Sequence, residues 1–160
     1  MMSILKIDDQ NEIYYEYIEP KGDGHTFVFV NALTGSTAAW NGVIGDRITE
    51  DGNGFLAYNF RGQDNSKFSE ELNLDTDLIV SDLCLLIEKL KLKNIILVGL
   101  SIGGLYASLA LEKGVKSNGL VLINTLRKNN SRLKWINETM VNVARYGGTS
   151  LLMDMNMPVI

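Results

Sequence analysis

Residues 95–104 read IILVGLSIGG, an apolar run that breaks abruptly into a turn with a serine between glycines. The following stretch, residues 105–111, is rich in leucine and alanine and holds no helix breaker. This pattern predicts a buried strand, a tight turn and a helix. Gly99 and Gly103, two places before and two places after Ser101, allow the strand and the helix to approach closely.

A turn of this kind, a nucleophile elbow, carries chemistry at its serine. Backbone strain lifts the Ser101 hydroxyl above the carboxyl ends of the strands, and the N–H of Ile102 at the start of the helix faces the same space. A hydroxyl beside a backbone donor is suited to acyl transfer through serine. The plain structural alternative is a turn that only connects a strand to a helix. The flanking elements and two motifs upstream favour the catalytic interpretation.

Composition narrows the classes of protein that the chain can belong to. Its 160 residues, 46% hydrophobic and 21% charged, suit a single globular domain. A net charge of −4 argues against nucleic acid as the main partner. No signal peptide and no window of about 18 uncharged apolar residues is present, so we expect a cytoplasmic protein without membrane spans. No ligand cluster suggests a metal or a cofactor, and we expect neither.

The order of expected elements indicates the fold class. Segments 3–8 and 11–19 predict a hairpin, and the elements expected after it are strands at 25–31, 54–60, 94–99 and 119–124 and helices at 38–48, 74–92 and 102–113. Strands that alternate with helices predict an α/β fold, with a mostly parallel, doubly wound sheet covered on both faces.

From residue 125 the character of the chain changes. An amphipathic helix is expected at 135–143, and residues 151–160 are rich in methionine. We expect a core at 1–125 and the start of a helical cap at 126–160. Met153, Met155 and Met157 either line an apolar pocket of this cap or pack in an ordinary way, and packing is the favoured interpretation.

Cys84, the single cysteine, lies among leucines in the expected helix at 74–92. It cannot form a disulfide within the chain. No histidine follows it to act as a base, so we expect it to fill the core rather than to react.

Segments 27–40 (FVFVNALTGSTAAW) and 59–66 (NFRGQDNS), together with the elbow, resemble the α/β-hydrolase fold superfamily over nearly the whole chain. The first is similar to the strand and oxyanion loop that usually carry His-Gly-x-x-Gly. Here Asn31 and Ala32 stand at the histidine and first glycine places, and Gly35 is retained. The resemblance makes the N–H of Leu33 the second oxyanion donor, and a backbone donor does not depend on its side chain.

The second segment is similar to the turn Asp-x-Arg-Gly-x-Gly-x-Ser of that superfamily. Asn59 and Asp64 replace the aspartate and the second glycine, whereas Arg61, Gly62 and Ser66 match. In the superfamily this turn braces the structure. The resemblance therefore implies a structural role for Arg61 rather than a catalytic one.

The resemblance implies a serine hydrolase that acts on a small-molecule ester, lactone or similar carbonyl substrate through an acyl-enzyme. The stretch ALTG at 32–35 is similar to the oxyanion loop of homoserine acetyltransferases, so an acyltransferase of the same fold is an alternative. The elbow sequence looks more like small esterases, lactonases and epoxide-hydrolase relatives. A non-catalytic binding protein of this fold is the third possibility.

The sequence after Ser101 shows neither the base nor the acid of a catalytic triad. No histidine follows Ser101, and the only one, His25, opens a strand whose far end, about 20 Å away, leads to the oxyanion loop. No later polar residue is placed to serve as the acid, and this holds for Glu112, Asn124, Glu138 and Asp154.

We therefore expect a truncated, weakly active N-terminal portion of such an enzyme. The strand at 119–124 would then be a hydrophobic sheet edge. Through this edge we expect self-association or binding of a companion chain.

Overall fold

The computed structural model describes residues 2–125 and 131–156. Their contacts form two units, Met1–Leu126 and Arg127–Ile160, each of which is considered by itself. No helix among the described residues is both long and apolar enough to span a membrane.

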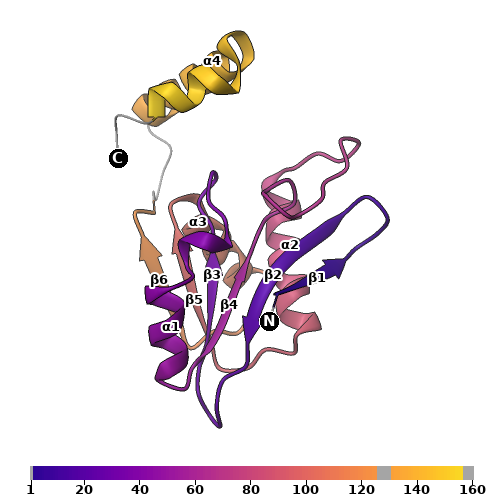
Figure 1. The fold of residues 1–160 in the computed structure, drawn as a ribbon, viewed down its shortest axis with the longest axis vertical. Coiled ribbons are helices and arrows are strands. Elements are labelled where there is room, and N and C mark those ends of the chain that lie inside the picture. Colours follow the sequence, from indigo (N-terminus) through magenta and orange to yellow (C-terminus); the bar gives the residue numbers. More distant parts are fainter. Residues whose placement is uncertain (1, 126–130, 157–160) are drawn as a thin grey trace. The chain divides into compact units, whose positions relative to one another are not determined.

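The first unit is a six-stranded sheet with helices (Figure 1). Its strands are β1 (Met2–Lys6), β2 (Glu12–Ile18), β3 (Thr26–Val30), β4 (Gly54–Tyr58), β5 (Ile95–Leu100) and β6 (Gly119–Ile123). Its helices are the 3₁₀ turn η1 (Thr37–Ala39), α1 (Val43–Glu50), α2 (Thr76–Lys89) and α3 (Ile102–Glu112). The strand order is β1-β2-β4-β3-β5-β6, antiparallel from β1 to β4 and parallel from β4 to β6. The predicted fold class, a hairpin followed by a mostly parallel doubly wound sheet, is confirmed.

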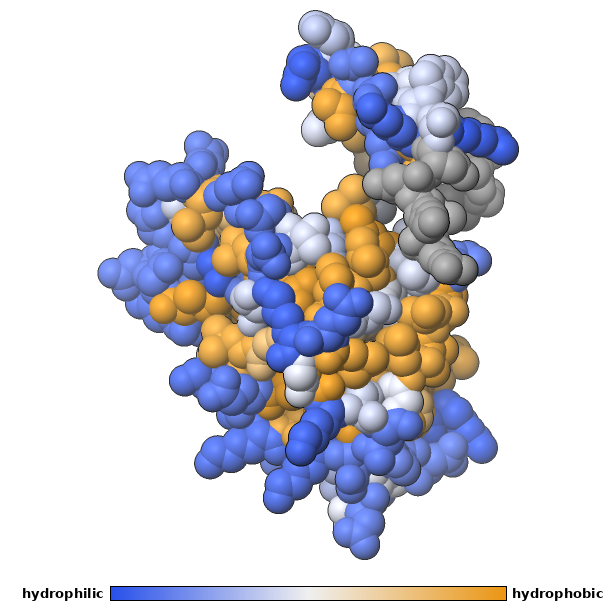
Figure 2. Space-filling view, turned by 180° about the vertical axis from the view of Figure 1, so that it is seen from behind, coloured by the Kyte–Doolittle hydropathy of each residue, from blue (hydrophilic) through white to orange (hydrophobic). Residues whose placement is uncertain are grey.

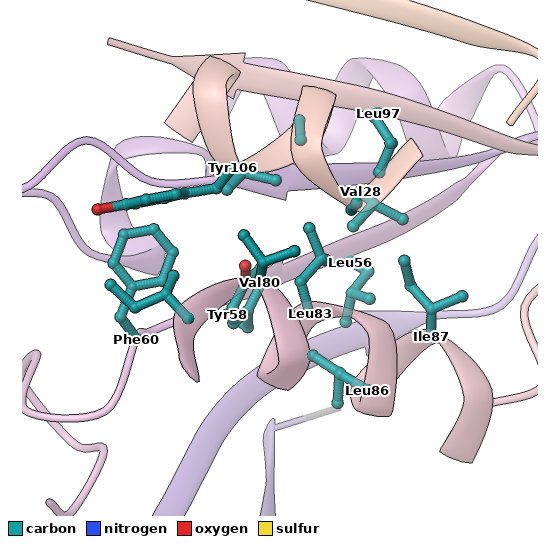
Figure 3. Packing of buried hydrophobic residues seen from close by; sticks show 14 of the residues in the cluster. Val28, Leu56, Tyr58, Phe60, Val80, Leu83, Leu86, Ile87, Leu97 and Tyr106 are labelled. Atoms are coloured by element: carbon teal, nitrogen blue, oxygen red, sulfur yellow. The ribbon is translucent and has the colours of Figure 1, made fainter. Parts of the chain in front are cut away.

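Both faces of the central strands are buried: successive side chains of a strand point to opposite faces, and each face packs into its own core cluster. Val28, Leu56 and Leu97 are fully buried in the larger core cluster, together with side chains of α2 and α3 (Figure 3). Their neighbours Phe29 and Phe55 belong to a second cluster, against which α1 packs through Ile48. This alternation explains why the strands read as nearly continuous apolar runs.

Helix α2 forms as its sequence predicts, with shorter ends. Asp75 caps the helix, because its carboxylate accepts a hydrogen bond from the Leu78 N–H at 2.9 Å. Ile79, Leu83 and Leu86 recur at helical spacing and are buried against the sheet.

The single helix predicted at 38–48 is wrong, because the chain forms η1 and then α1. Gly42 between them has φ 67°, a left-handed conformation that no continuous helix contains. The Trp40 indole N–H donates to Asn31 Oδ1 at 2.6 Å, and the ring lies 4.7 Å from the Phe29 ring centroid. Anchoring this indole in the core separates the two helical turns.

The second unit contains α4 (Ser131–Asn156), which includes the predicted helix at 135–143 and extends beyond it at both ends. Gly148, with φ 73° and ψ 176°, kinks it into two helical segments. Met153 and Met155 are exposed, and Met157 lies outside the described residues. The assignment of this unit as the start of a cap, and the role of its methionines, stay predictions.

Strand β6 ends the sheet and is unusually apolar for an edge. It pairs with β5 and with no other strand among the described residues. Its side chains alternate between the two faces and are 37% to 50% exposed: Leu120, Val121, Leu122 and Ile123. Apolar residues reach the surface on the side of the molecule where β6 lies (Figure 2). Exposed backbone groups and apolar side chains together form a surface suited to pairing with another strand.

We propose that the chain associates through β6. Leu122→Lys places a charge on this edge and should shift the protein toward monomer in sedimentation equilibrium at micromolar concentration. Val43→Lys, at the 88% exposed position on α1, is the matched control and should leave the association unchanged. A wild-type chain that stays monomeric throughout this range would contradict the proposal.

Candidate active site

Ser101 lies in the turn between β5 and α3, as the elbow pattern predicts. Its φ of 55° and ψ of −122° are strained for a residue with a side chain, and the residue is exposed. Its N–H donates to the Ile123 carbonyl at 2.8 Å, which ties the turn to the end of β6. The strained conformation persists because strand, helix and neighbouring strand all constrain it.

Three glycines let α3 pass close to the sheet. A Cβ on Gly99 would lie within 2.5 Å of the backbone N of Gly104, and a Cβ on Gly103 would overlap the carbonyl oxygens of Val30 and Asn31. Gly104 also leaves no room, since a Cβ there would overlap the Thr125 side chain. Sequence reasoning identified Gly99 and Gly103 and missed Gly104, although the doubled glycine at 103–104 was a signal for it.

The loop that follows β3 lies at the same end of the sheet as Ser101, where the carboxyl ends of the strands meet. Val30 at the end of β3 pairs with Gly99 of β5, so both strands end side by side (Figure 1). Residues 32–35 then form a turn closed by a hydrogen bond from the Gly35 N–H to the Ala32 carbonyl at 3.0 Å. Leu33 in this turn is 68% exposed.

Ile102 is the first residue of α3, and the first amides of a helix lack partners within it. Two neighbouring segments at the carboxyl end of the sheet therefore contain the N–H groups of Leu33 and Ile102. Their role as oxyanion donors stays a prediction.

Three amide side chains, two of them buried, hydrogen-bond around this loop. Asn31 is 1% exposed, and its Nδ2 donates to the Tyr58 carbonyl at 2.8 Å. Asn59, which is fully buried, accepts the backbone N–H of Thr37 at 2.8 Å through its Oδ1. Gln63 donates to two carbonyls of the loop itself. Sequence reasoning did not find these contacts, because they join segments 22 to 31 residues apart.

Arg61 braces the structure through a buried ion pair. Its Nε donates to Asp82 Oδ2 at 2.8 Å, and its Nη2 donates to the other carboxylate oxygen; both side chains are about 5% to 6% exposed. Burial raises the pKa of the Asp82 carboxyl, and the hydrogen bonds and charge of Arg61 offset part of this shift. Ser66 of the same turn donates to the Asn59 carbonyl at 2.9 Å.

The remaining sequence candidates lie away from the carboxyl edge of the sheet or in the second unit. His25 precedes β3 at its amino end, where its N–H donates to Asn53 Oδ1 at 3.1 Å. Glu112 is the last residue of α3, at the end opposite Ser101. Glu138 and Asp154 belong to α4. The structure therefore brings no described histidine to Ser101.

The two remaining candidates are Asn124, which lies at a bend of the backbone, and Cys84, which packs against the core. Asn124 directly follows β6 with φ 49°, a left-handed conformation. Cys84 packs against the larger core cluster, and burial raises the pKa of its thiol, so the thiolate is disfavoured. No group of three or more metal-ligating side chains occurs among the described residues.

A mostly parallel sheet with a strained serine between the interior strand β5 and the helix that follows it defines a protein of the α/β-hydrolase class. A family model described as the alpha/beta hydrolase fold matches residues 25–150. The chain belongs to this family.

Solved structures of the same fold extend the comparison. An esterase (EaEST) from Exiguobacterium antarcticum shares 22% identity and superimposes with a TM-score of 0.81, over 98% of this chain and 60% of that chain. A carboxylesterase structure from Nitrososphaera gargenis shares 20% identity with a TM-score of 0.84, over 96% and 57%. The bromoperoxidase from Bacillus anthracis shares 24% identity with a TM-score of 0.77, over 91% and 55%. The chain thus spans less than two thirds of each of these proteins. A search of curated proteins found no match.

Gly103→Ala should destabilise the protein by about 3 kcal/mol, because the added methyl meets backbone oxygens that cannot move aside without shifting β3. Urea denaturation followed by circular dichroism measures the change. Gly119→Ala is the matched control: its Cβ would meet Ile96 at 3.8 Å, an ordinary contact, and the free energy of unfolding should change by less than about 1 kcal/mol. Equal effects of the two variants would contradict the close approach at Gly103.

Removing one partner of the buried ion pair should cost about 3 to 5 kcal/mol, because the other charge stays buried without compensation. Arg61→Met and Asp82→Leu test this by urea denaturation. The double variant should be less destabilised than the sum of the single variants. Lys6→Ala, which breaks the exposed Lys6–Asp9 pair, should have no measurable effect. Additive losses at Arg61 and Asp82 would show that the pair is not coupled.

Proposed function

We propose that the chain is part of a serine hydrolase that acts on an ester, lactone or similar carbonyl compound through an acyl-enzyme. Ser101 attacks the carbonyl carbon as its hydroxyl proton passes to a base, and the N–H groups of Leu33 and Ile102 stabilise the resulting oxyanion. The ester C–O bond then breaks and the alcohol takes up this proton and leaves, and water later hydrolyses the acyl-enzyme. The chemistry requires no metal and no cofactor. We also propose a cytoplasmic location, as expected from the sequence.

The strained conformation of Ser101 is the observation that carries this proposal. A φ of 55° costs free energy and has no purpose in a simple connection, where a glycine would avoid the strain. Three close-packed glycines support the same turn, which further favours a functional serine. Esterases among the structural neighbours are consistent with the reaction class.

The proposal assigns the base and the acid of the triad to residues outside this chain. The chain holds one histidine, His25, at the wrong end of β3. The structural neighbours are longer, with 55% to 60% of three of them covered. Without a base, only the oxyanion donors and substrate binding contribute to the rate.

An acyltransferase is the second candidate, supported by the ALTG stretch at 32–35. It would form the same acyl-enzyme at Ser101 and pass the acyl group to an acceptor other than water. The two reactions use the same residues of this chain and differ only in the acceptor. A non-catalytic binding protein is the alternative in which Ser101 forms no acyl-enzyme.

Incubation of the chain with p-nitrophenyl acetate should acetylate Ser101 slowly. Mass spectrometry of the digested protein locates the acetyl group, and p-nitrophenol release gives the rate. The rate should stay within about 10³ to 10⁴ over water because the triad is incomplete. Ser101→Ala should abolish the acetylation, and Ser81→Ala on the surface of α2 should not.

Two results would contradict parts of the proposal. Efficient turnover that is lost in Ser101→Ala would mean that a base lies within residues 1–160. A wild-type chain that is never acetylated at Ser101, and whose rate equals that of Ser101→Ala, would support the non-catalytic alternative.

A further inference from the structure

Gln63 connects the turn after β4 to the loop after β3 through one side chain. Its Nε2 donates to the Ala32 carbonyl at 3.0 Å and to the Leu33 carbonyl at 2.9 Å. Its Oε1 accepts the N–H of Phe60 at 2.9 Å. Because the Phe60 N–H can only donate, the amide oxygen must face it and the NH₂ group must face the loop. Both donor hydrogens of Gln63 are thus used on two successive carbonyls of one turn.

These bonds control the direction of the Leu33 N–H. The Ala32 carbonyl and the Leu33 N–H belong to the same peptide unit, which is planar and trans, so they point in opposite directions. A carbonyl held toward Gln63 therefore directs the Leu33 N–H away from Gln63. The same argument fixes the next peptide unit through the Leu33 carbonyl. We propose that Gln63 is a positioning residue, which orients the Leu33 N–H as an oxyanion donor. This inference rests on the proposed function.

Packing holds the two ends of the loop, at Asn31 and Thr37, but holds the turn between them only weakly. The Leu33 side chain is 68% exposed, and residues 31–36 belong to no helix or strand. The Ala32 carbonyl also accepts the Gly35 N–H at 3.0 Å, but that bond closes the turn on itself without attaching it to the sheet. The two bonds from Gln63 attach the turn to a segment thirty residues away.

Gln63 is itself held on a rigid support. Its own N–H donates to the Phe60 carbonyl at 2.9 Å, and its carbonyl accepts the Ser66 N–H at 2.8 Å. Asn31 Nδ2 donates to Gln63 Oε1 at 3.4 Å, and the Trp40 indole holds the other end of the Asn31 amide at 2.6 Å. A donor placed in this way needs no reorganisation when charge develops, which is the requirement for oxyanion stabilisation.

The plain structural alternative is that Gln63 only closes its own turn through Phe60 and Ser66. Substitutions that keep the acceptor oxygen or remove the donor hydrogens of the Gln63 amide distinguish this alternative from the positioning role. Gln63→Glu keeps an acceptor for Phe60 and replaces the donors with a carboxylate that repels the loop carbonyls. Gln63→Met keeps the length and removes both polar ends. Asn65→Asp adds the same charge two residues later at an exposed position and is the matched control.

The first measurement is the rate of Ser101 acetylation by p-nitrophenyl acetate. Gln63→Glu should lower the limiting rate about 10- to 100-fold, somewhat less than complete loss of an oxyanion donor, and leave the half-saturating concentration within about two-fold. The deficit relative to wild type should shrink at low pH, because the protonated introduced carboxyl regains one donor. Asn65→Asp should match wild type at each pH.

The second measurement is the NMR order parameter of the Leu33 amide, which needs no activity. It should fall from about 0.85 to below about 0.6 in Gln63→Met, because the turn loses its attachment. Wild-type order parameters and rates in both Gln63 variants would overturn the proposal. So would a rate loss that accompanies a fall in melting temperature and does not recover at low pH. Acetylation that is independent of Ser101 would instead refute the proposed function, and the Leu33 order parameter would still test Gln63.

Discussion

The close contact between α3 and the ends of β3 and β5 is the constraint on which the rest of the site depends. Gly103 sits so near the carbonyls of Val30 and Asn31 that no side chain fits between them. At this distance the chain can pass from strand to helix only through a very tight turn, and Ser101 at its centre takes a positive φ. The strain at one residue is stabilised by packing that extends across three elements.

The same contact sets the position of the loop after β3. The oxygens that exclude a Cβ at Gly103 belong to the residues with which β3 ends and the loop begins. The helix that starts behind the serine and the loop beside it are therefore located by one set of backbone atoms. Below the loop, uncharged amide side chains satisfy the backbone groups, and none of Asn31, Asn59 and Gln63 brings an ionised group next to the carbonyls.

The first unit carries all of these features and also shows an unusual edge. Residues of β6 have the apolar character of an interior strand on both faces, yet pairing among the described residues is limited to β5. Ser101 hydrogen-bonds to the last residue of β6, so whatever covers this strand lies one element away from the serine. The pairing of the edge strand β6 and the geometry around Ser101 are therefore connected through this hydrogen bond.

Much of the fold and part of the site could be read from the sequence, because they depend on local patterns. Alternating or continuous apolar runs determined the strands, and helical spacing determined α2. Gly99 and Gly103 around Ser101 determined the turn and its backbone strain, which the structure shows as a positive φ. The break between η1 and α1 escaped this reasoning, since the position of the Trp40 indole against Asn31 and Phe29 is set across the sheet.

Only the tertiary structure decided which residues meet. It brought Gln63 to Ala32 and Leu33, Arg61 to Asp82, and Gly104 to Thr125. These contacts join segments about twenty to thirty residues apart, so they depend on strand order and helix placement, which no local propensity encodes. The sequence by itself determined that a serine lies at the carboxyl end of a mostly parallel sheet. The folded chain decided what holds the backbone around it, because that depends on distances between elements.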